Sequence, residues 1–122
     1  MFKSALTTLL VASTAFAACS FSTEGHGFEM NIYGQTSCGT GNHHEEFFGA
    51  GVNPACDCFN IATALNDKVK SFVFTASTRH SINIFKDGNC KGTVLGTSVG
   101  NWIDSTVSTA GQQMSSFEVC LF

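Results

Sequence analysis

Short segments of the chain alternate between apolar and polar residues with a period of two. The alternation is clearest in residues 30–32, 82–84 and 117–121. Because neighbouring side chains on a strand point to opposite faces, this pattern predicts half-buried strands. Gly, Asn and Asp residues cluster in 39–42 and 86–89, which predicts corners where the backbone takes positive φ.

Helical spacing is confined to one segment. The apolar residues of 61–69 fall on one helical face, but Asn66 and Asp67 interrupt them. We therefore predict a single helical turn there and no long helix.

The two halves of the chain resemble each other. Residues 31–38 align with residues 83–90, and residues 69–74 align with residues 114–119, with a short insertion in the first copy. A unit of four strands cannot bury both of its faces alone, so two copies are expected to stack into one sandwich, with Ile32, Phe72, Ile84 and Phe117 pointing inward. The copies are predicted to span about residues 28–75 and 80–121.

The N-terminus has the pattern of a secretory signal peptide. Residues 1–17 combine Lys3, a short apolar run and the small-residue ending Ala15-Phe16-Ala17. The apolar run is too short to span a bilayer. Residues 18–122 are then expected to form a single domain that is secreted to the extracellular space.

All six cysteines follow this segment, and an even number in a small exported domain predicts three disulfides. Their pairing stays open. Cys56 and Cys58, expected to point to opposite faces of a strand, are predicted to belong to different bridges. A zinc site is disfavoured because zinc motifs usually space their cysteines more widely. The cysteines are Cys19, Cys38, Cys56, Cys58, Cys90 and Cys120.

Charge narrows the range of partners. Only 12% of the residues are charged, the formal net charge is −3, and no basic run is present. Nucleic acid and anionic membranes would lack the positive charge they require, so we expect neither nucleic-acid binding nor membrane insertion.

The sequence gives no convincing catalytic constellation. Residues 96–100 match the pattern G-x-S-x-G, but that motif requires a large α/β sheet and a His that follows the Ser. No His follows Ser98, and the two glycines are expected in turns. We therefore predict that the protein is not an enzyme.

A polar and aromatic segment lies within the first copy. His43 and His44 precede two glutamates and the pair Phe47-Phe48. Metal binding by the histidines is disfavoured because neighbouring side chains on a strand diverge. We expect a polar edge or inserted loop in which one phenylalanine is exposed, and take His43, His44, Phe47 and Phe48 as candidate partner contacts.

Several segments resemble the βγ-crystallin family. Residues 82–92, INIFKDGNCKG, look like the opening of its Greek-key motif, with an aromatic ending the first strand and an acidic corner. Residues 65–72, LNDKVKSF, are similar to its calcium-loop segment, and residues 113–117, QMSSF, to the second copy of that segment. The resemblance spans residues 28–121 and implies an all-β fold, a β-sandwich of two Greek-key motifs.

The chain departs from the family at two core positions. Cys38 and Cys90 stand where the family usually has an aromatic residue. This suggests a disulfide-stabilised, extracellular branch that resembles fungal killer-toxin-like proteins and the small cysteine-rich effectors of plant-infecting fungi.

The resemblance also implies at most one calcium site, and a weak one. In the family each ion takes ligands from both repeats, and here Asn66 and Asp67 remain in the first copy while Ser115 remains in the second. The other combination would join Lys70 to Gln112 and offer no carboxylate. No other cofactor is expected.

The function predicted first is that of a secreted, non-enzymatic effector that binds an extracellular protein or a cell-surface target of a host or competitor. An antimicrobial, killer-toxin-like protein is an alternative on the same fold. A protease inhibitor is another, and it would require an exposed, disulfide-tied loop within residues 43–58.

Overall fold

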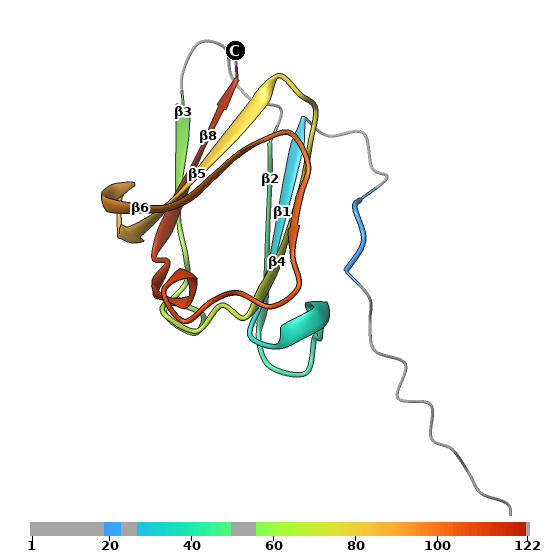
Figure 1. The fold of residues 1–122 in the computed structure, drawn as a ribbon, viewed down its shortest axis with the longest axis vertical. Helices are drawn as coiled ribbons and strands as arrows, with labels where there is room; N and C mark the ends of the chain where they lie inside the picture. The colour runs from blue at the N-terminus through green and yellow to red at the C-terminus, as the bar shows by residue number, and fades with distance from the viewer. Residues whose placement is uncertain (1–18, 23–26, 50–55, 122) are drawn as a thin grey trace, which may run out of the picture.

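The computed structural model describes residues 19–22, 27–49 and 56–121 (Figure 1). The predicted signal peptide lies outside these residues. Neither short helix in the described part has the length and apolar character to cross a bilayer. The strands are β1 (Phe28–Tyr33), β2 (His44–Gly49), β3 (Cys56–Asn60), β4 (Ser71–Ala76), β5 (His80–Asp87), β6 (Lys91–Val99), β7 (Trp102–Asp104) and β8 (Ser116–Leu121), and the 3-10 helices are η1 (Thr36–Cys38) and η2 (Gly111–Gln113).

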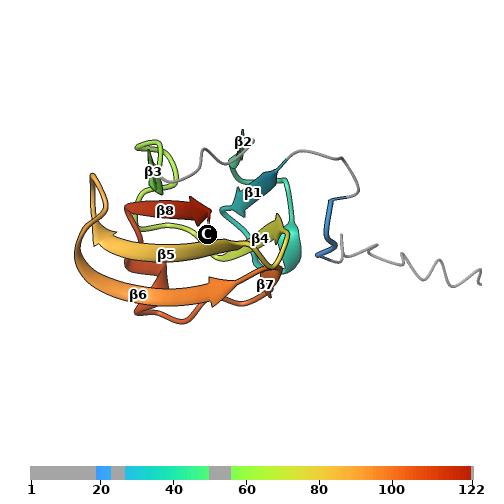
Figure 2. The same cartoon turned by 90° about the horizontal axis from the view of Figure 1, so that it is seen from above.

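The strands form two antiparallel sheets that face each other (Figures 1 and 2). The first sheet has the order β2-β1-β4-β7 and the second has the order β3-β8-β5-β6. The first motif, β1–β4, therefore contributes its third strand to the second sheet, and the second motif, β5–β8, contributes its third strand to the first. The predicted sandwich of two Greek-key motifs is confirmed.

A buried serine fixes the corner after the first strand of each motif. In the first motif the Ser71 hydroxyl donates to the Gln35 carbonyl at 2.5 Å and accepts the Cys38 N–H at 2.9 Å. The serine side chain thus satisfies one backbone carbonyl and one backbone N–H of the corner, in place of hydrogen bonds from a neighbouring strand.

The second motif repeats this arrangement. The Ser116 hydroxyl donates to the Asp87 carbonyl at 2.5 Å and accepts the Cys90 N–H at 2.9 Å. The alignment of the two halves therefore extends from the pattern of apolar residues to individual hydrogen bonds.

Positive φ occurs in both corners, but in the first it precedes the predicted glycine cluster. Ser37 and Cys38 have φ of 55° and 58°, and their equivalents Asn89 and Cys90 have 58° and 54°. Gly39 instead has an extended backbone with φ of −67°. The prediction was wrong for the first corner because the serine hydrogen bonds set the turn before the glycines begin.

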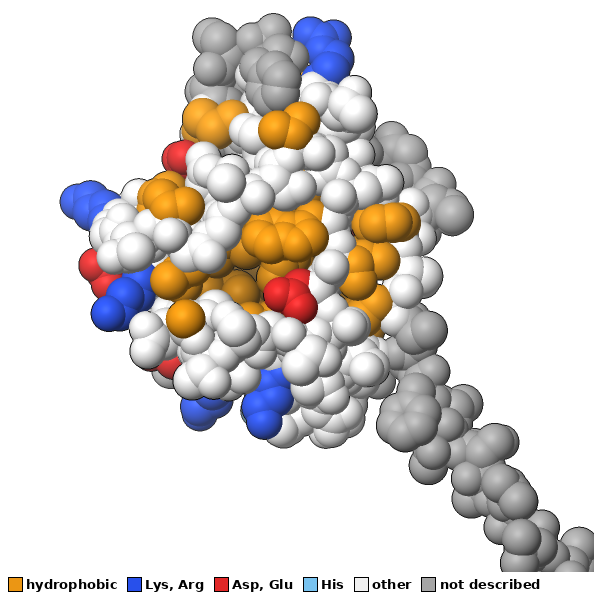
Figure 3. Space-filling model, in the orientation of Figure 1, with side chains coloured by type: hydrophobic (Ala, Val, Ile, Leu, Met, Phe, Trp, Pro, Cys, Tyr) orange, Lys and Arg blue, Asp and Glu red, His pale blue; other side chains and the backbone are white. Residues whose placement is uncertain are grey.

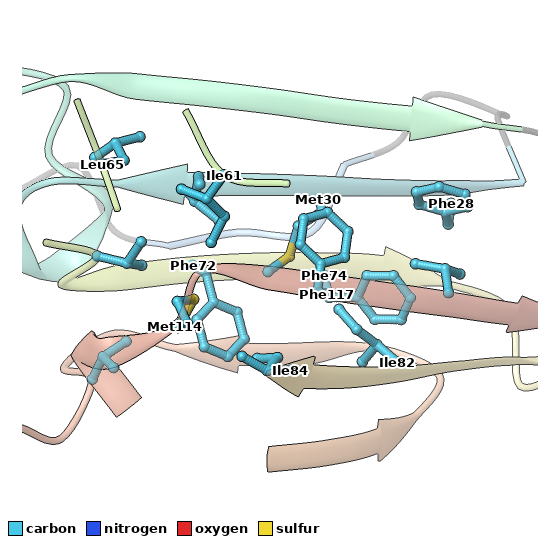
Figure 4. Close-up of a cluster of buried hydrophobic side chains, with 14 residues drawn as sticks. Phe28, Met30, Ile61, Leu65, Phe72, Phe74, Ile82, Ile84, Met114 and Phe117 are labelled. Atoms are coloured by element: carbon cyan, nitrogen blue, oxygen red, sulfur yellow. The ribbon is translucent and has the colours of Figure 1, made fainter. Parts of the chain in front are cut away.

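The core lies between the two sheets and is mostly aromatic and aliphatic (Figure 4). The four residues predicted to point inward, Ile32, Phe72, Ile84 and Phe117, are all buried. Trp102 of β7 packs edge-on against Phe72, with ring centroids 4.7 Å apart. Since Trp102 belongs to an exchanged strand, this contact links the two motifs within one core.

The predicted helical turn is present between β3 and β4. The N–H groups of Leu65 and Asn66 both donate to the Ala62 carbonyl at 2.9 Å. Ile61, Leu65 and Val69 are buried. The segment therefore closes one end of the sandwich without forming a longer helix.

All six cysteines are paired, as predicted. The bridges are Cys19–Cys38, Cys56–Cys120 and Cys58–Cys90. The last two attach β3, an exchanged edge strand, to the second motif.

Cys56 and Cys58 belong to different bridges, as predicted, but the reason given for it was wrong. Residues two apart on a strand share a face, and both cysteines are exposed on the same face of β3. They form separate bridges because Cys56 lies directly opposite Cys120 in the ladder, whereas Cys58 reaches the corner that follows β5.

We predict that Phe117→Ala lowers the free energy of unfolding by about 3–5 kcal/mol, because it removes a ring with 0% exposure from the centre of the core. Phe48→Ala is the matched control, and it should change stability by about 0.5 kcal/mol or less because that ring is 59% exposed. Denaturant unfolding of both variants measures this. Equal losses would contradict the assignment of the two rings.

Candidate functional site

A polar hollow of about 500 Å³ lies at one end of the sandwich, between the turn that precedes β4 and the corner that follows β5. Its walls come from both motifs and are mainly polar. The lining residues are Asp67, Lys86, Asp87, Gly88, Gln113 and Ser115.

The structure brings together the three residues of the predicted calcium site. The Ser115 hydroxyl donates to Asn66 Oδ1 at 2.6 Å, although the two residues are 49 positions apart. Asp67 follows directly in the chain, with φ of 60°, and its N–H donates to the Met114 carbonyl at 3.4 Å. The turn before β4 is thus held against the start of β8.

The donor set of this hollow is chemically suited to a hard cation. The carboxylate of Asp67 and the hydroxyl of Ser115 line it, and the amide oxygen of Asn66 is hydrogen-bonded to that hydroxyl. These are the candidate ligands, and oxygen ligands are those that Ca²⁺ takes. Lys86 lines the same hollow, and its positive charge repels a cation bound there. The arrangement favours weak rather than tight binding.

Asp87 is a second carboxylate on this hollow that the sequence did not assign to it. Its place in the corner at residues 86–89 indicated a turn and gave no other signal. The turn before β4 and the corner after β5 meet only when the two motifs pack together.

The second candidate site is the outer face of the first sheet, along β2 and β1. His44 stacks on Tyr33 with ring centroids 4.6 Å apart and an angle of 5° between the planes. The His44 Nε2 lies 2.9 Å from Asn31 Oδ1, and the Asn31 amide donates to Glu29 Oε1 at 2.7 Å. This chain of contacts crosses two neighbouring strands and orders the polar surface.

Of the aromatic pair, only Phe48 lies on this surface. Phe47 points inward and contacts Phe59 and Phe117, with centroid distances of 5.7 and 5.0 Å. Its proposed role as a partner contact was wrong, because successive residues of β2 face opposite sides and one of the two must enter the core. His43 precedes β2 and lies away from this face, in a second hollow.

Tyr33 has a raised pKa. Burial of the phenol disfavours its charged form, and the negative charges of Glu29 and then Glu46 add to the effect. The outer face of the first sheet is therefore a negatively charged environment around an aromatic stack.

The G-x-S-x-G pattern at residues 96–100 lies on a strand and the bend that follows it. Residues 96–99 lie in β6, which leads to another strand rather than to a helix. Gly96 was predicted to lie in a turn, and this prediction was wrong because Gly96 belongs to β6. A side chain at this position would collide with the Trp102 indole. Gly100, with φ of 77°, does occupy a turn.

One group of potential metal ligands lies close together in residues 19–22, 27–49 and 56–121, namely Cys56, Glu118 and Cys120. The sulfurs of Cys56 and Cys120 are bonded to each other and are not available as thiolates.

Two Greek-key motifs that exchange their third strands form a known class of β-sandwich. We compared this sandwich with solved structures. A βγ-crystallin domain of Abundant Perithecial Protein from Neurospora crassa, in its Ca²⁺-bound form, matches with a TM-score of 0.50 at 14% identity. The match covers 82% of this chain and 96% of that domain. A structure from work on the evolution of the eye lens βγ-crystallin domain fold matches with a TM-score of 0.52 at 17% identity, covering 85% and 95% of the two chains.

The chain therefore has the βγ-crystallin fold, as its sequence motifs suggested. No protein-family model matches the sequence, and no curated protein is significantly similar to it in sequence.

We predict that Tyr33, the single tyrosine of the chain, ionises with a midpoint above its ordinary pKa of 10.0. The unfolded chain releases this proton first, so the free energy of unfolding should fall as the pH rises above about 10. Near-ultraviolet absorbance of the tyrosinate measures the midpoint. Glu46→Gln should lower it, and a midpoint at or below 10.0 in the native protein would contradict the prediction.

Proposed function

We propose that this protein works outside the cell as a non-enzymatic binding protein, acting as an effector on a host or competitor target. The observation that carries the proposal is the outer face of the first sheet, which presents the exposed Phe48 and, four residues away on the same strand, the ordered stack of His44 and Tyr33. Exposed aromatic residues next to polar groups are typical of protein–protein contacts. Three disulfides suit an oxidising extracellular setting.

The fold limits how such a surface can act. β2, which carries Phe48 and His44, is the edge strand of the first sheet and pairs with β1 from His44 to Gly49, so the contact residues are held on a sheet rather than on a loop. A preformed surface loses little conformational freedom on binding, which favours affinity for a partner of complementary shape. The proposed partner is an extracellular protein or a protein exposed on a cell surface.

The experiment that tests this proposal is affinity capture from extracellular fluid, with the oxidised protein, residues 18–122, as bait. We expect Phe48→Ala to lose the captured partner, because the exposed ring is removed from the contact. Val99→Ala is the matched control: Val99 is 58% exposed but lies on β6 of the other sheet, so capture should persist. Equal capture by both variants would place the contact elsewhere.

A second proposed activity is weak calcium binding at the first hollow. It is supported by the hydrogen bond between Ser115 and Asn66, which joins residues of the two motifs beside the Asp67 carboxylate. The fungal βγ-crystallin domain of the same fold was crystallised in a Ca²⁺-bound form. Asn66, Asp67 and Ser115 would hold the ion here, and it would fasten the turn before β4 to the start of β8.

For calorimetric titration with Ca²⁺ we expect a dissociation constant of about 0.1–1 mM, the range of weak extracellular sites. Asp67→Asn should abolish the heat of binding, because it removes a carboxylate while keeping a residue that tolerates positive φ. Asp57→Asn on β3 is the control and should bind as the native protein does.

Lys86→Ser provides an opposite test. Removal of the cation that lines the hollow should tighten calcium binding, because it relieves charge repulsion. An absence of heat in both the native protein and Lys86→Ser would refute the calcium proposal. It would leave the partner-binding proposal unaffected, because the two sites share no residue.

A further inference from the structure

A second hollow, of about 340 Å³, lies at the same end of the sandwich as the first. It is formed by the β1–β2 connection and by the turn before β4. Gly34, Asn42, His43, Lys68 and Lys70 are among the residues that line it. In Figure 3, basic side chains lie at the lower end of the molecule, where Figure 1 draws this turn.

The two hollows share aligned positions of the motifs, although residues of both motifs line the first hollow and residues of the first motif line the second. In the alignment of the motifs, Lys70 takes the place of Ser115 and Lys68 takes the place of Gln113. At these two aligned positions the second motif therefore has oxygen donors and the first has ammonium groups.

The charge of the second hollow has one sign. No Asp or Glu lines it, and neither Lys68 nor Lys70 makes an ion pair with any residue in the described ranges. The whole chain has only six Lys and Arg residues, so the convergence of two of them is a marked local concentration.

Backbone hydrogen bonds hold together the segments that form this hollow. The Gly34 N–H donates to the His43 carbonyl at 3.0 Å, and the Lys70 N–H donates to the Tyr33 carbonyl at 2.9 Å. The Lys70 carbonyl in turn accepts the Val107 N–H at 2.9 Å. A side chain at Gly34 would collide with the Asn42 carbonyl, so the glycine lets the connection close over the hollow.

We propose that this second hollow binds a tetrahedral oxyanion, a phosphate or sulfate group. Two ammonium groups supply charge-assisted hydrogen bonds, and the Asn42 amide and the His43 ring add further donors. The site is independent of the proposed partner surface and of the proposed calcium site. Its preference for anions follows from Lys70. Where the second motif has the Ser115 hydroxyl, which suits a cation, the first motif has an ammonium group, which repels one.

The experiment is a titration of the oxidised protein with inorganic phosphate and, separately, inorganic sulfate at constant ionic strength, followed by the amide NMR signals of Gly34, His43 and Lys70. We expect saturable shifts at these positions. Lys70→Ser, which places the second motif's residue in the first, should weaken binding by about tenfold or more. Lys91→Ser removes a lysine that lines neither hollow and should leave binding unchanged.

Linear, unsaturable shifts in the native protein would overturn the proposal, as would equal weakening by Lys70→Ser and Lys91→Ser, which would indicate general charge attraction. If Lys70→Ser alters the fold, as judged by its thermal transition, Lys68→Ser replaces it with the same expected loss. A sulfated oligosaccharide distinguishes the source of the anion. Tighter binding than inorganic sulfate assigns the site to a polymer-borne group, and equal binding assigns it to the free ion.

Discussion

The exchange of third strands is the constraint on which the rest of this molecule depends. Each sheet takes three strands from one motif and one from the other, so neither motif can complete its own sheet. The core, the first hollow and two of the three disulfides all form between residues of the two motifs. The two exchanged strands are retained differently: β3 is attached by Cys56 and Cys58, whereas the shorter β7 is held by the packing of Trp102 on Phe72.

Local features of the fold could be predicted from the sequence because they depend on near neighbours. Alternation identified the inward residues, and the alignment of the halves identified two copies whose serines make matching hydrogen bonds. The position of positive φ in the first corner could not be predicted. It is set by Ser71, which lies more than thirty residues further along the chain and fixes the turn at Ser37 before the glycines.

The disulfide pairing required knowledge of the exchange itself. Cys56 and Cys58 share a face, so side-chain direction alone could not separate their partners. The candidate calcium residues, by contrast, were found together because family resemblance already implied that Asn66 and Ser115 come from complementary copies. The contribution of Asp87 to the hollow was missed because its position indicated only a turn.

The pairing of β3 has a consequence for the order of events during biosynthesis. Cys56 and Cys58 leave the ribosome long before Cys90 and Cys120, with which they pair at separations of 32 and 64 residues. Only Cys19 and Cys38, 19 residues apart, belong wholly to the first part to emerge. The Cys56–Cys120 bridge, and with it the complete native set, must therefore wait for the C-terminal strand. In the meantime the thiols of Cys56 and Cys58 are without their native partners, and either can form a non-native bridge with a cysteine that is already present.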